Sequence, residues 1–299
     1  MAGLLVCGSI ALDDLEGPFG RVEDELGGSA IYFALAASLI RPVSVCAPVG
    51  RSDAQRIHEV TAGRSIDLAL LGVVDAPTYH WSARQQRGSN LDLGSRDSIY
   101  DVWEPQPPAG FEGWAFVGSM RPDRQALAAA RLEEAALLAG DSMRSYLRGR
   151  PPAASQLLEA CDWFFANEEE LAALGGDVRR AADFRSASEL SGLVVKAGAR
   201  GCTAWTPTGA LHVPALTERP VLDVTGAGDA LAGGFLARWL ETGGQPEGLA
   251  DALVYGVACA SIAISDIGVR GLGQATADQL EERVEEVWAC LNGESARRS

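Results

Sequence analysis

Lysine is almost absent from this 299-residue chain: of its 25 basic residues, all are arginine except Lys196. Acidic residues number 40, which gives a formal net charge of −15 at pH 7. Nucleic acids are repelled by such a charge, so we expect no nucleic-acid partner. Codon bias would favour arginine throughout, whereas a site that needs a compact ammonium group would keep its lysine. Lys196 is therefore either a functional residue or a chance exception.

Cysteine pairs and long apolar runs are also missing. The six cysteines form no C-x-x-C pair and have no histidine cluster beside them, so we expect neither a disulfide framework nor a zinc site. No apolar run reaches the roughly 18 residues of a membrane span. The first residues enter a strand pattern without a basic leader, so we expect no signal peptide. A cytoplasmic protein without membrane contact fits these absences.

Two common nucleotide-binding motifs are lacking. The P-loop pattern G-x-x-x-x-G-K-[ST] does not occur. The first strand is followed by Gly8-Ser-Ile rather than by G-x-G-x-x-G, which argues against a dinucleotide-binding oxidoreductase.

Short apolar strands alternate with helices along most of the chain. Strands are expected at 4–7, 43–49, 66–74, 113–117, 135–139, 163–166 and 193–196, and a hairpin at 202–213. Three helices follow at about 227–242, 247–264 and 275–291. This alternation predicts an α/β fold with a doubly wound, mostly parallel, Rossmann-like sheet. We expect a single domain over residues 1–299.

Two stretches, at about 12–25 and 75–105, interrupt this rhythm. The second alternates at 78–84 and again at 98–103, with a polar segment at 85–96 between them. Alternation of this kind predicts an antiparallel strand pair outside the main sheet. The pair would form a small β lid, or the contact surface of a homodimer; a monomer is the alternative. His80 lies here as an ordinary lid residue or as a catalytic one.

The most informative stretch is Asp223-Val-Thr-Gly-Ala-Gly-Asp229, which leads directly into an apolar helix. Glycines let an anion approach the free N–H groups at a helix start. A carboxylate beside such a site is explained if Asp229 accepts a proton from a nucleophile while the N–H groups hold a transferring phosphate.

Polar motifs follow three other predicted strands. Asp13 and Asp14 come shortly after the first strand, Asn167-Glu-Glu-Glu170 follows another, and Lys196-x-Gly198-x-x-Gly201 ends a third. The carboxyl ends of strands in an open α/β sheet share one crevice. The alternatives are a solvated turn at Asp13, and acids that enrich the first turn of a helix at 168–170.

These motifs together resemble those of the ribokinase-like, or PfkB, family of carbohydrate and nucleoside kinases, over nearly the whole chain. The resemblance implies a ribokinase-like fold and transfer of the γ-phosphoryl group of ATP to a hydroxyl group. It makes Asp229 the general base. It makes the loop of Gly226, Ala227, Gly228 and Asp229 an anion hole for the charge that develops during transfer.

On the nucleotide side, the resemblance implies that ATP is bound by residues of three motifs: Lys196, Gly198, Gly201, Thr225 and Asn167. Asn167 and Glu170 match the pair that organises Mg²⁺, mostly through water. Residues 258–268 match the helix and loop that flank the adenine.

On the acceptor side, Asp13 matches the aspartate that accepts hydrogen bonds from two sugar hydroxyls. Gly27 and Gly28 match the pair that lets the sugar approach the backbone, although a glycine pair before a helix is also a simple cap. Many sugar kinases carry asparagine four residues after the second glycine, where this chain has Tyr32. An amide contact is lost and an aromatic ring narrows the pocket, which argues against plain ribokinase activity.

The acceptor therefore stays open between a sugar or sugar-like molecule and a nucleoside. A nucleoside base would need an aromatic platform, for which the chain offers Tyr32, Phe33, Tyr79 and Trp81. Three further residues after a strand would face the same pocket: Asp141, Met143 and Arg144. A non-catalytic binding protein on the same fold would be expected to lack the base or the anion hole, and both are intact in this sequence.

Overall fold

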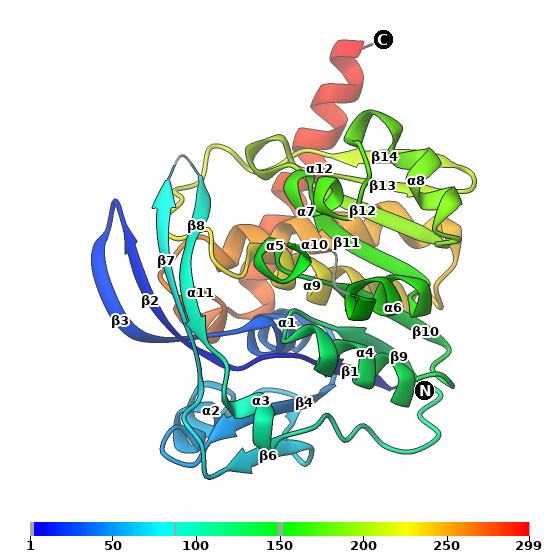
Figure 1. Ribbon diagram of the computed structural model, residues 1–299. Coiled ribbons are helices and arrows are strands. Elements are labelled where there is room, and N and C mark those ends of the chain that lie inside the picture. The colour runs from blue at the N-terminus through cyan, green and yellow to red at the C-terminus, as the bar shows by residue number, and fades with distance from the viewer. Residues whose placement is uncertain (1–2, 87, 149–151, 299) are drawn as a thin grey trace.

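Residues 3–86, 88–148 and 152–298 are described by a computed structural model, in which a large sheet carries helices on both faces and a smaller sheet stands beside it (Figure 1). The large sheet has the strand order β14-β13-β12-β11-β10-β9-β1-β4-β5, with β6 also paired to β4. Its strands are β1 (Leu4–Cys7), β4 (Val43–Gly50), β5 (Ile66–Asp67), β6 (Leu71–Val74), β9 (Trp114–Val117), β10 (Leu137–Asp141), β11 (Trp163–Asn167), β12 (Gly192–Lys196), β13 (Cys202–Thr206) and β14 (Gly209–Val213).

All these strands pair in parallel except β13 and β14, which extend one edge as an antiparallel hairpin. The prediction of a mostly parallel, doubly wound sheet is confirmed. Because β12, β11, β10, β9 and β1 are parallel neighbours, their carboxyl ends meet at one edge of the sheet.

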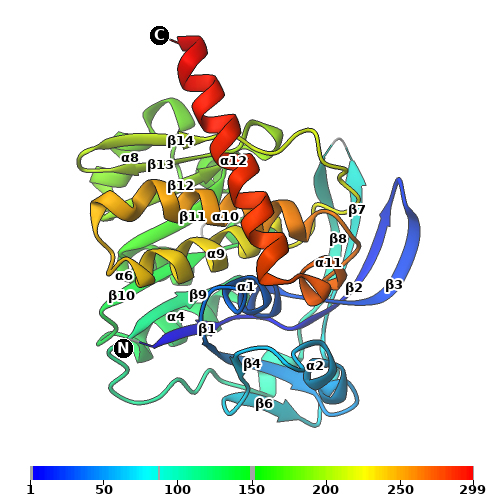
Figure 2. The same cartoon turned by 180° about the vertical axis from the view of Figure 1, so that it is seen from behind.

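Helices cover both faces of the large sheet. One face carries α1 (Ser29–Ala37), α9 (Ala227–Glu241), α10 (Leu249–Ala263), α11 (Arg270–Gln274) and α12 (Ala277–Arg298), seen in front in Figure 2. The other face carries α4 (Pro122–Arg131), α6 (Pro152–Ala160), α7 (Glu168–Ala173) and α8 (Ala181–Ala187). The remaining short helices are α2 (Ala54–Val60), α3 (Ile99–Val102) and α5 (Arg144–Leu147). Within the described ranges, no helix is both long and apolar enough to cross a membrane.

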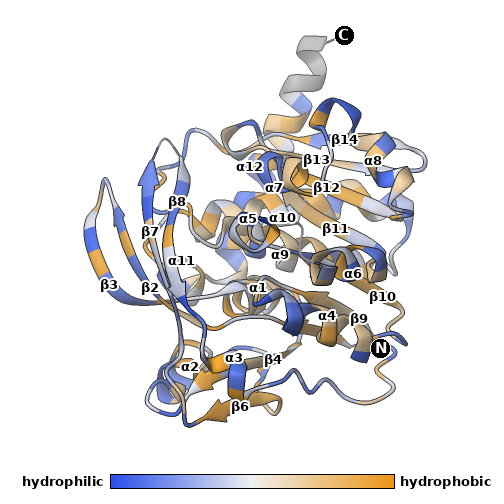
Figure 3. Ribbon diagram, in the orientation of Figure 1, coloured by the Kyte–Doolittle hydropathy of each residue, from blue (hydrophilic) through white to orange (hydrophobic). Residues whose placement is uncertain are grey.

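The smaller sheet, called the lid below, has the strand order β3-β2-β7-β8 and stands at the left of Figure 1. It consists of β2 (Ala11–Gly17), β3 (Gly20–Gly27), β7 (Tyr79–Gln86) and β8 (Ser89–Arg96). β2 runs parallel to β7, and the other two pairings are antiparallel. Figure 3 shows blue and orange segments in turn along these strands, as in a sheet with one face toward solvent.

The prediction that residues 98–103 form the partner strand of 78–84 is wrong. Residues 98–103 do not form it: Ile99 and Tyr100 are consecutive buried residues on α3, where a helical turn sends both into the core. The partner is β8, which lies in the polar segment 85–96. Most of β8 is exposed, so its sequence lacks the apolar alternation that marks a half-buried strand.

An aromatic cluster joins α9 to the middle of the large sheet. The Phe235 ring of α9 lies 5.5 Å from the Phe165 ring of β11, and the Trp239 ring lies 4.7 Å from that of Trp163, measured between ring centroids. Phe165 also meets Phe116 of β9 edge-on at 6.0 Å. The orientation of α9, which begins at the predicted anion hole, is therefore fixed by core packing.

Replacing Phe235, which is fully buried, with alanine should lower the free energy of unfolding by about 3–5 kcal/mol, because a large cavity would remain in this cluster. Urea denaturation followed by circular dichroism measures the change. Val102→Ala is the control, since Val102 is an exposed apolar residue and its loss should stay within about 0.5 kcal/mol. Similar losses in both variants would contradict the packing described here.

Candidate active site

The carboxyl ends of β10, β11 and β12 bring Asp141, Asn167 and Lys196 to one edge of the large sheet. The Lys196 Nζ atom lies 3.8 Å from Asp141 Oδ2 and 3.9 Å from Glu170 Oε2. A Cβ atom placed on Gly228 would lie 2.7 Å from the same Nζ atom. The ammonium group therefore lies against the first turn of α9, between two carboxylates.

Residues Asp223–Asp229, called the anion loop below, approach this ammonium group from the other side. The loop is held by the buried Asp223, whose carboxylate accepts hydrogen bonds from the N–H groups of Thr225, at 2.9 Å, and Gly268, at 3.1 Å. Gly226 then takes a left-handed conformation, with φ of 72°, and α9 begins at Ala227. The N–H groups of a first helical turn have no partner within the helix, so those of Gly228 and Asp229 can bind an anion. The Ala227 N atom lies 3.5 Å from the Val224 carbonyl oxygen.

Asp229 lies in the first turn of α9 with its Oδ1 atom buried and without a hydrogen-bond partner among the residues described. Removal from water raises the pKa of this carboxyl to about 6; the Lys196 ammonium lowers the pKa and the Glu170 carboxylate raises it. A carboxylate of that pKa is an efficient proton acceptor near neutral pH. Strongly shifted groups of this kind are typical of catalytic sites.

The charges around Lys196 depend on one another. Burial opposes the charged form of Lys196, but the carboxylates of Glu170, Asp141 and Asp229 outweigh it, so that the pKa of the ammonium is raised. Burial also raises the pKa of Asp141, with Asp229 as the next cause. Lys196 is the only lysine of the chain. Its position among these carboxylates favours a functional role over a chance exception.

Asn167 and Glu170 form a reciprocal helix cap at the start of α7. Asn167 Oδ1 accepts from the Glu170 N–H group at 2.8 Å, and Glu170 Oε2 accepts from the Asn167 N–H group at 2.7 Å. The motif therefore caps α7, whose first turn also contains the acids Glu168, Glu169 and Glu170. The cap uses one carboxylate oxygen of Glu170, and the other can still accept from the water shell of a cation.

The acceptor side is formed where β2 and β3 meet α1. Asp13 of β2 is buried, and its Oδ1 atom has no hydrogen-bond partner within the described structure. The pKa of Asp13 is raised well above its usual range. The main cause is burial, and the second is the negative charge of Asp223. A Cβ atom on Gly27 would overlap Asp13 Oδ2, and one on Gly28, whose φ is 100°, would lie 2.5 Å from the Ser9 carbonyl oxygen. The glycine pair is therefore required by close packing.

Tyr32 of α1 connects the two halves of the site. Its ring covers Gly226, where a Cβ atom would overlap the ring, and its Cε2 atom lies 3.6 Å from the Cβ position of Gly27. The side chain is only 1% exposed, and its hydroxyl has no hydrogen-bond partner among the described residues. Tyr32 thus lies between the predicted acceptor side and the anion loop.

The family model for "pfkB family carbohydrate kinase" matches residues 10–275. This chain belongs to the PfkB family. Its match to the ATP-dependent ribose-1-phosphate kinase of Halopiger xanaduensis has 34% identity over 161 residues, 53% of this chain and 51% of that protein. The matched part spans about half the length of this curated relative.

Solved structures show the same fold. The nucleoside kinase of Burkholderia thailandensis in complex with inosine has a TM-score of 0.77 at 20% identity and covers 96% of this chain and 99% of its own. The aminoimidazole riboside kinase of Salmonella enterica, complexed with aminoimidazole riboside and an ATP analog, has a TM-score of 0.75 at 23% identity, covering 94% and 99%. At these identities the likeness shows the ribokinase-like fold alone, and that prediction is confirmed.

Two further residues that the sequence of this PfkB protein singled out, Arg144 and His80, lie beside carboxylates. The Arg144 side chain is exposed and pairs with Glu169 of α7 at 2.6 Å. His80 is a lid-strand residue whose Nε2 atom lies 3.3 Å from Asp14 Oδ1.

Gly198 and Gly201 form a tight turn after β12. Both have positive φ, 57° and 84°, and the Ala197 N–H group donates to the Gly201 carbonyl oxygen at 2.8 Å. They shape the backbone beside Lys196.

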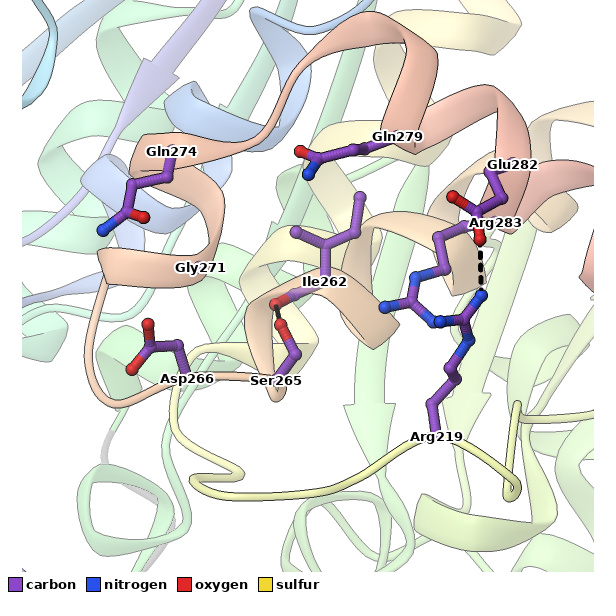
Figure 4. A pocket seen from close by; sticks show the side chains of 9 residues that line it. All are labelled: Arg219, Ile262, Ser265, Asp266, Gly271, Gln274, Gln279, Glu282 and Arg283. Atoms are coloured by element: carbon purple, nitrogen blue, oxygen red, sulfur yellow. Dashed lines mark hydrogen bonds and ion pairs between the residues drawn. The ribbon is translucent and has the colours of Figure 1, made fainter.

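A cavity of about 360 Å³ lies between α10, α11, α12 and the loop at Arg219 (Figure 4). The Arg219 and Glu282 side chains, both part of its lining, meet at 2.7 Å, as the dashed line shows. Its lining includes neither Asp13 nor Asp229, so it is separate from the site at the strand ends. Ile262, Ser265 and Asp266, which belong to the stretch predicted to flank the adenine, are among the residues that line this cavity.

Sequence reasoning missed two features of the site. Asn90 of β8 reaches the anion loop, where its Nδ2 atom lies 2.9 Å from Thr225 Oγ1. Val221 and Leu222 precede the anion loop and are 50% and 41% exposed. Asn90 lies in a polar segment without any motif, so nothing in the sequence singles it out.

Gly226→Ala should destabilise the protein more than Gly243→Ala does. Both glycines have φ near 70°, so both variants incur about 1–2 kcal/mol of backbone strain. A Cβ atom on Gly243 meets open space, whereas one on Gly226 displaces the Tyr32 ring. Chemical denaturation measures both losses, and calorimetry should show weaker ATP binding for Gly226→Ala alone. Equal losses would contradict the contact with Tyr32.

Proposed function

We propose that this protein is an ATP-dependent kinase that transfers the γ-phosphoryl group to a hydroxyl of a small sugar or sugar-like acceptor. The observation that carries the proposal is the Asp229 carboxyl, which has a pKa of about 6 and lies beside Lys196 at the N-terminus of α9. A base and an anion-binding helix start at one point are what phosphoryl transfer to an alcohol requires.

In this mechanism the oxygen of the acceptor hydroxyl attacks the γ-phosphorus, and the Asp229 carboxylate accepts the proton of that hydroxyl. The bond between that phosphorus and the bridging oxygen breaks, and ADP is the leaving group. The N–H groups of Ala227, Gly228 and Asp229 stabilise the charge on the transferring group. Lys196, held at the carboxylates of Asp141 and Glu170, adds positive charge beside Gly228.

The donor set at the strand ends fits Mg²⁺, which prefers oxygen ligands and keeps much of its water. Asn167 and Glu170, with the buried Asp141 next to them, would hold the hydrated ion on the ATP side. When bound, Mg²⁺ would neutralise phosphate charge. Asp141 Oδ1 is buried without a hydrogen-bond partner among the described residues, which supports a further polar ligand here.

ATP would approach from the turn at Gly198–Gly201, with Thr225 at the phosphates. The exposed side chains of Val221 and Leu222 offer an apolar surface for the adenine next to the anion loop. The Leu222 N–H group donates to the Ile264 carbonyl oxygen at 2.9 Å, so this surface adjoins the stretch 258–268. That contact supports the predicted adenine position on the side of α10 that faces Leu222.

For the acceptor, Asp13 would accept hydrogen bonds from sugar hydroxyls, and Gly27 and Gly28 would let the sugar approach the backbone. The aromatic residues considered as a platform for a nucleoside base are mostly core residues: Tyr32, Phe33 and Tyr79 are buried, and Phe33 stacks on Phe116 at 4.8 Å. This favours a sugar-like acceptor. A nucleoside remains the second candidate because the structural neighbours include nucleoside kinases.

The lid would also support a homodimer. β8 is an edge strand of the lid, and Leu91 and Leu93 on it are 47% and 52% exposed. An exposed edge with apolar side chains favours pairing with a second copy. We place the reaction in the cytoplasm, where ATP is supplied.

A panel of sugars, sugar phosphates including ribose 1-phosphate, cyclitols and nucleosides, tested with ATP and Mg²⁺, should identify an acceptor through ADP release. Asp229→Asn should then lower turnover by about 10²–10⁴-fold because the general base is lost. Calorimetry should show unchanged ATP binding in that variant. Near-normal turnover of Asp229→Asn would exclude Asp229 as the base, and no transfer to any acceptor would overturn the proposed function.

The pH profile of kcat/KM should report the raised pKa of Asp229. The base acts in its deprotonated form, so kcat/KM should be maximal above the pKa of about 6 and fall about tenfold per pH unit below it. Steady-state rates between pH 5 and 8 in one buffer series measure this, with circular dichroism at each pH to verify folding. A profile that is flat through pH 6 would contradict Asp229 as the titrating base.

A further inference from the structure

The Asn90 side chain of the lid touches the loop that would hold the transferring phosphate. Its Nδ2 atom donates to Thr225 Oγ1 over 2.9 Å, across 135 residues of sequence, in a partly buried position. We propose that Asn90 is a positioning residue that couples the docking of the lid to the geometry of the anion loop. The inference deepens the proposed kinase function and rests on it for its catalytic consequence.

Thr225 is a sensitive point of the anion loop. Its N–H group donates to Asp223 Oδ1, and the next residue is Gly226, whose left-handed conformation starts the helix. Thr225 is buried, and its hydroxyl oxygen accepts a hydrogen bond from the Asn90 amide of the lid. A displaced Thr225 would therefore move the N–H groups that follow it.

The lid carries Asn90 and Asp13 on one small sheet. Asp13 of β2 pairs with Trp81 of β7, and the Trp81 Nε1 atom donates to Asp92 Oδ1 of β8 at 3.2 Å. Asp92 lies two residues from Asn90 on the same strand. An acceptor bound to Asp13 would thus fix the sheet that places Asn90 on Thr225.

The consequence concerns the order of events in the site. With the lid docked, Thr225 is held by two hydrogen bonds, one from its N–H group to Asp223 and one from the Asn90 amide to its hydroxyl. With the lid away, Thr225 loses its hydrogen bond to Asn90 and the loop is less ordered. The transfer geometry is then complete only when the acceptor side is closed, which limits transfer of the phosphoryl group to water.

Hydrogen exchange of the ligand-free protein tests the coupling without depending on activity. Asn90→Ala and Thr225→Val each remove one partner, and both should raise amide exchange about three- to tenfold in two segments, 223–230 and 89–96. The double variant should exchange no faster than either single variant, and Thr225→Ser, which keeps the hydroxyl, should match the wild type. Gln86→Ala, an exposed amide truncation on β7 of the same hairpin, should change neither segment.

Kinetics with the acceptor found by the panel supply the second measurement. Asn90→Ala should lower kcat about three- to tenfold with little change in the KM for the acceptor, and this effect should vanish in the Thr225→Val background. If Asn90→Ala instead raises only the KM for the acceptor, Asn90 is a substrate ligand and the proposal is overturned.

The two proposals can fail separately. Unchanged exchange of 223–230 in Asn90→Ala, or additive effects in the double variant, overturn the coupling even when the wild type is an active kinase. Coupled exchange in a protein that phosphorylates no acceptor would uphold the contact between lid and loop while the kinase proposal falls.

Discussion

The site depends on the balance between one ammonium group and three carboxylates. Lys196 lies 3.8 Å from Asp141 and 3.9 Å from Glu170, and its charge also offsets that of Asp229. Burial alone would neutralise these groups, since an isolated buried charge is costly. Because the carboxylates keep Lys196 charged, a positive charge can persist beside the anion loop in a protein whose net charge is −15.

The large sheet provides the rigid base for this arrangement. Parallel strands place Asp141, Asn167 and Lys196 on successive strand ends, and the aromatic cluster around Phe235 sets the orientation of α9. The charges are thus held by backbone hydrogen bonds and core packing rather than by flexible surface contacts. A site built on such elements needs little reorganisation during reaction.

Strands, helices and motifs of the main domain were predictable because they follow apolar periodicity and glycine placement. The anion loop, the strand-end residues and the C-terminal helices lie near their predicted positions. The lid was harder to predict: β8 is mostly exposed and carries no apolar alternation, so its pairing with β7 and the contact of Asn90 with Thr225 depend on tertiary structure. The burial of the Tyr32 hydroxyl, which has no hydrogen-bond partner among the residues described, could not be predicted either. The sequence shows an aromatic residue but not that its ring covers Gly226.

The tight packing of the glycines limits how this site can change over evolution. A methyl group on Gly27, Gly28 or Gly226 would overlap Asp13, the Ser9 backbone or the Tyr32 ring. These three glycines therefore cannot be replaced one at a time by larger residues without moving their neighbours. New acceptor preferences would have to arise in the lid, where β2, β7 and β8 present exposed side chains that can vary one at a time. Substitutions in these lid strands would then change the acceptor preference, while Asn90 on β8 would have to keep its hydrogen bond to Thr225.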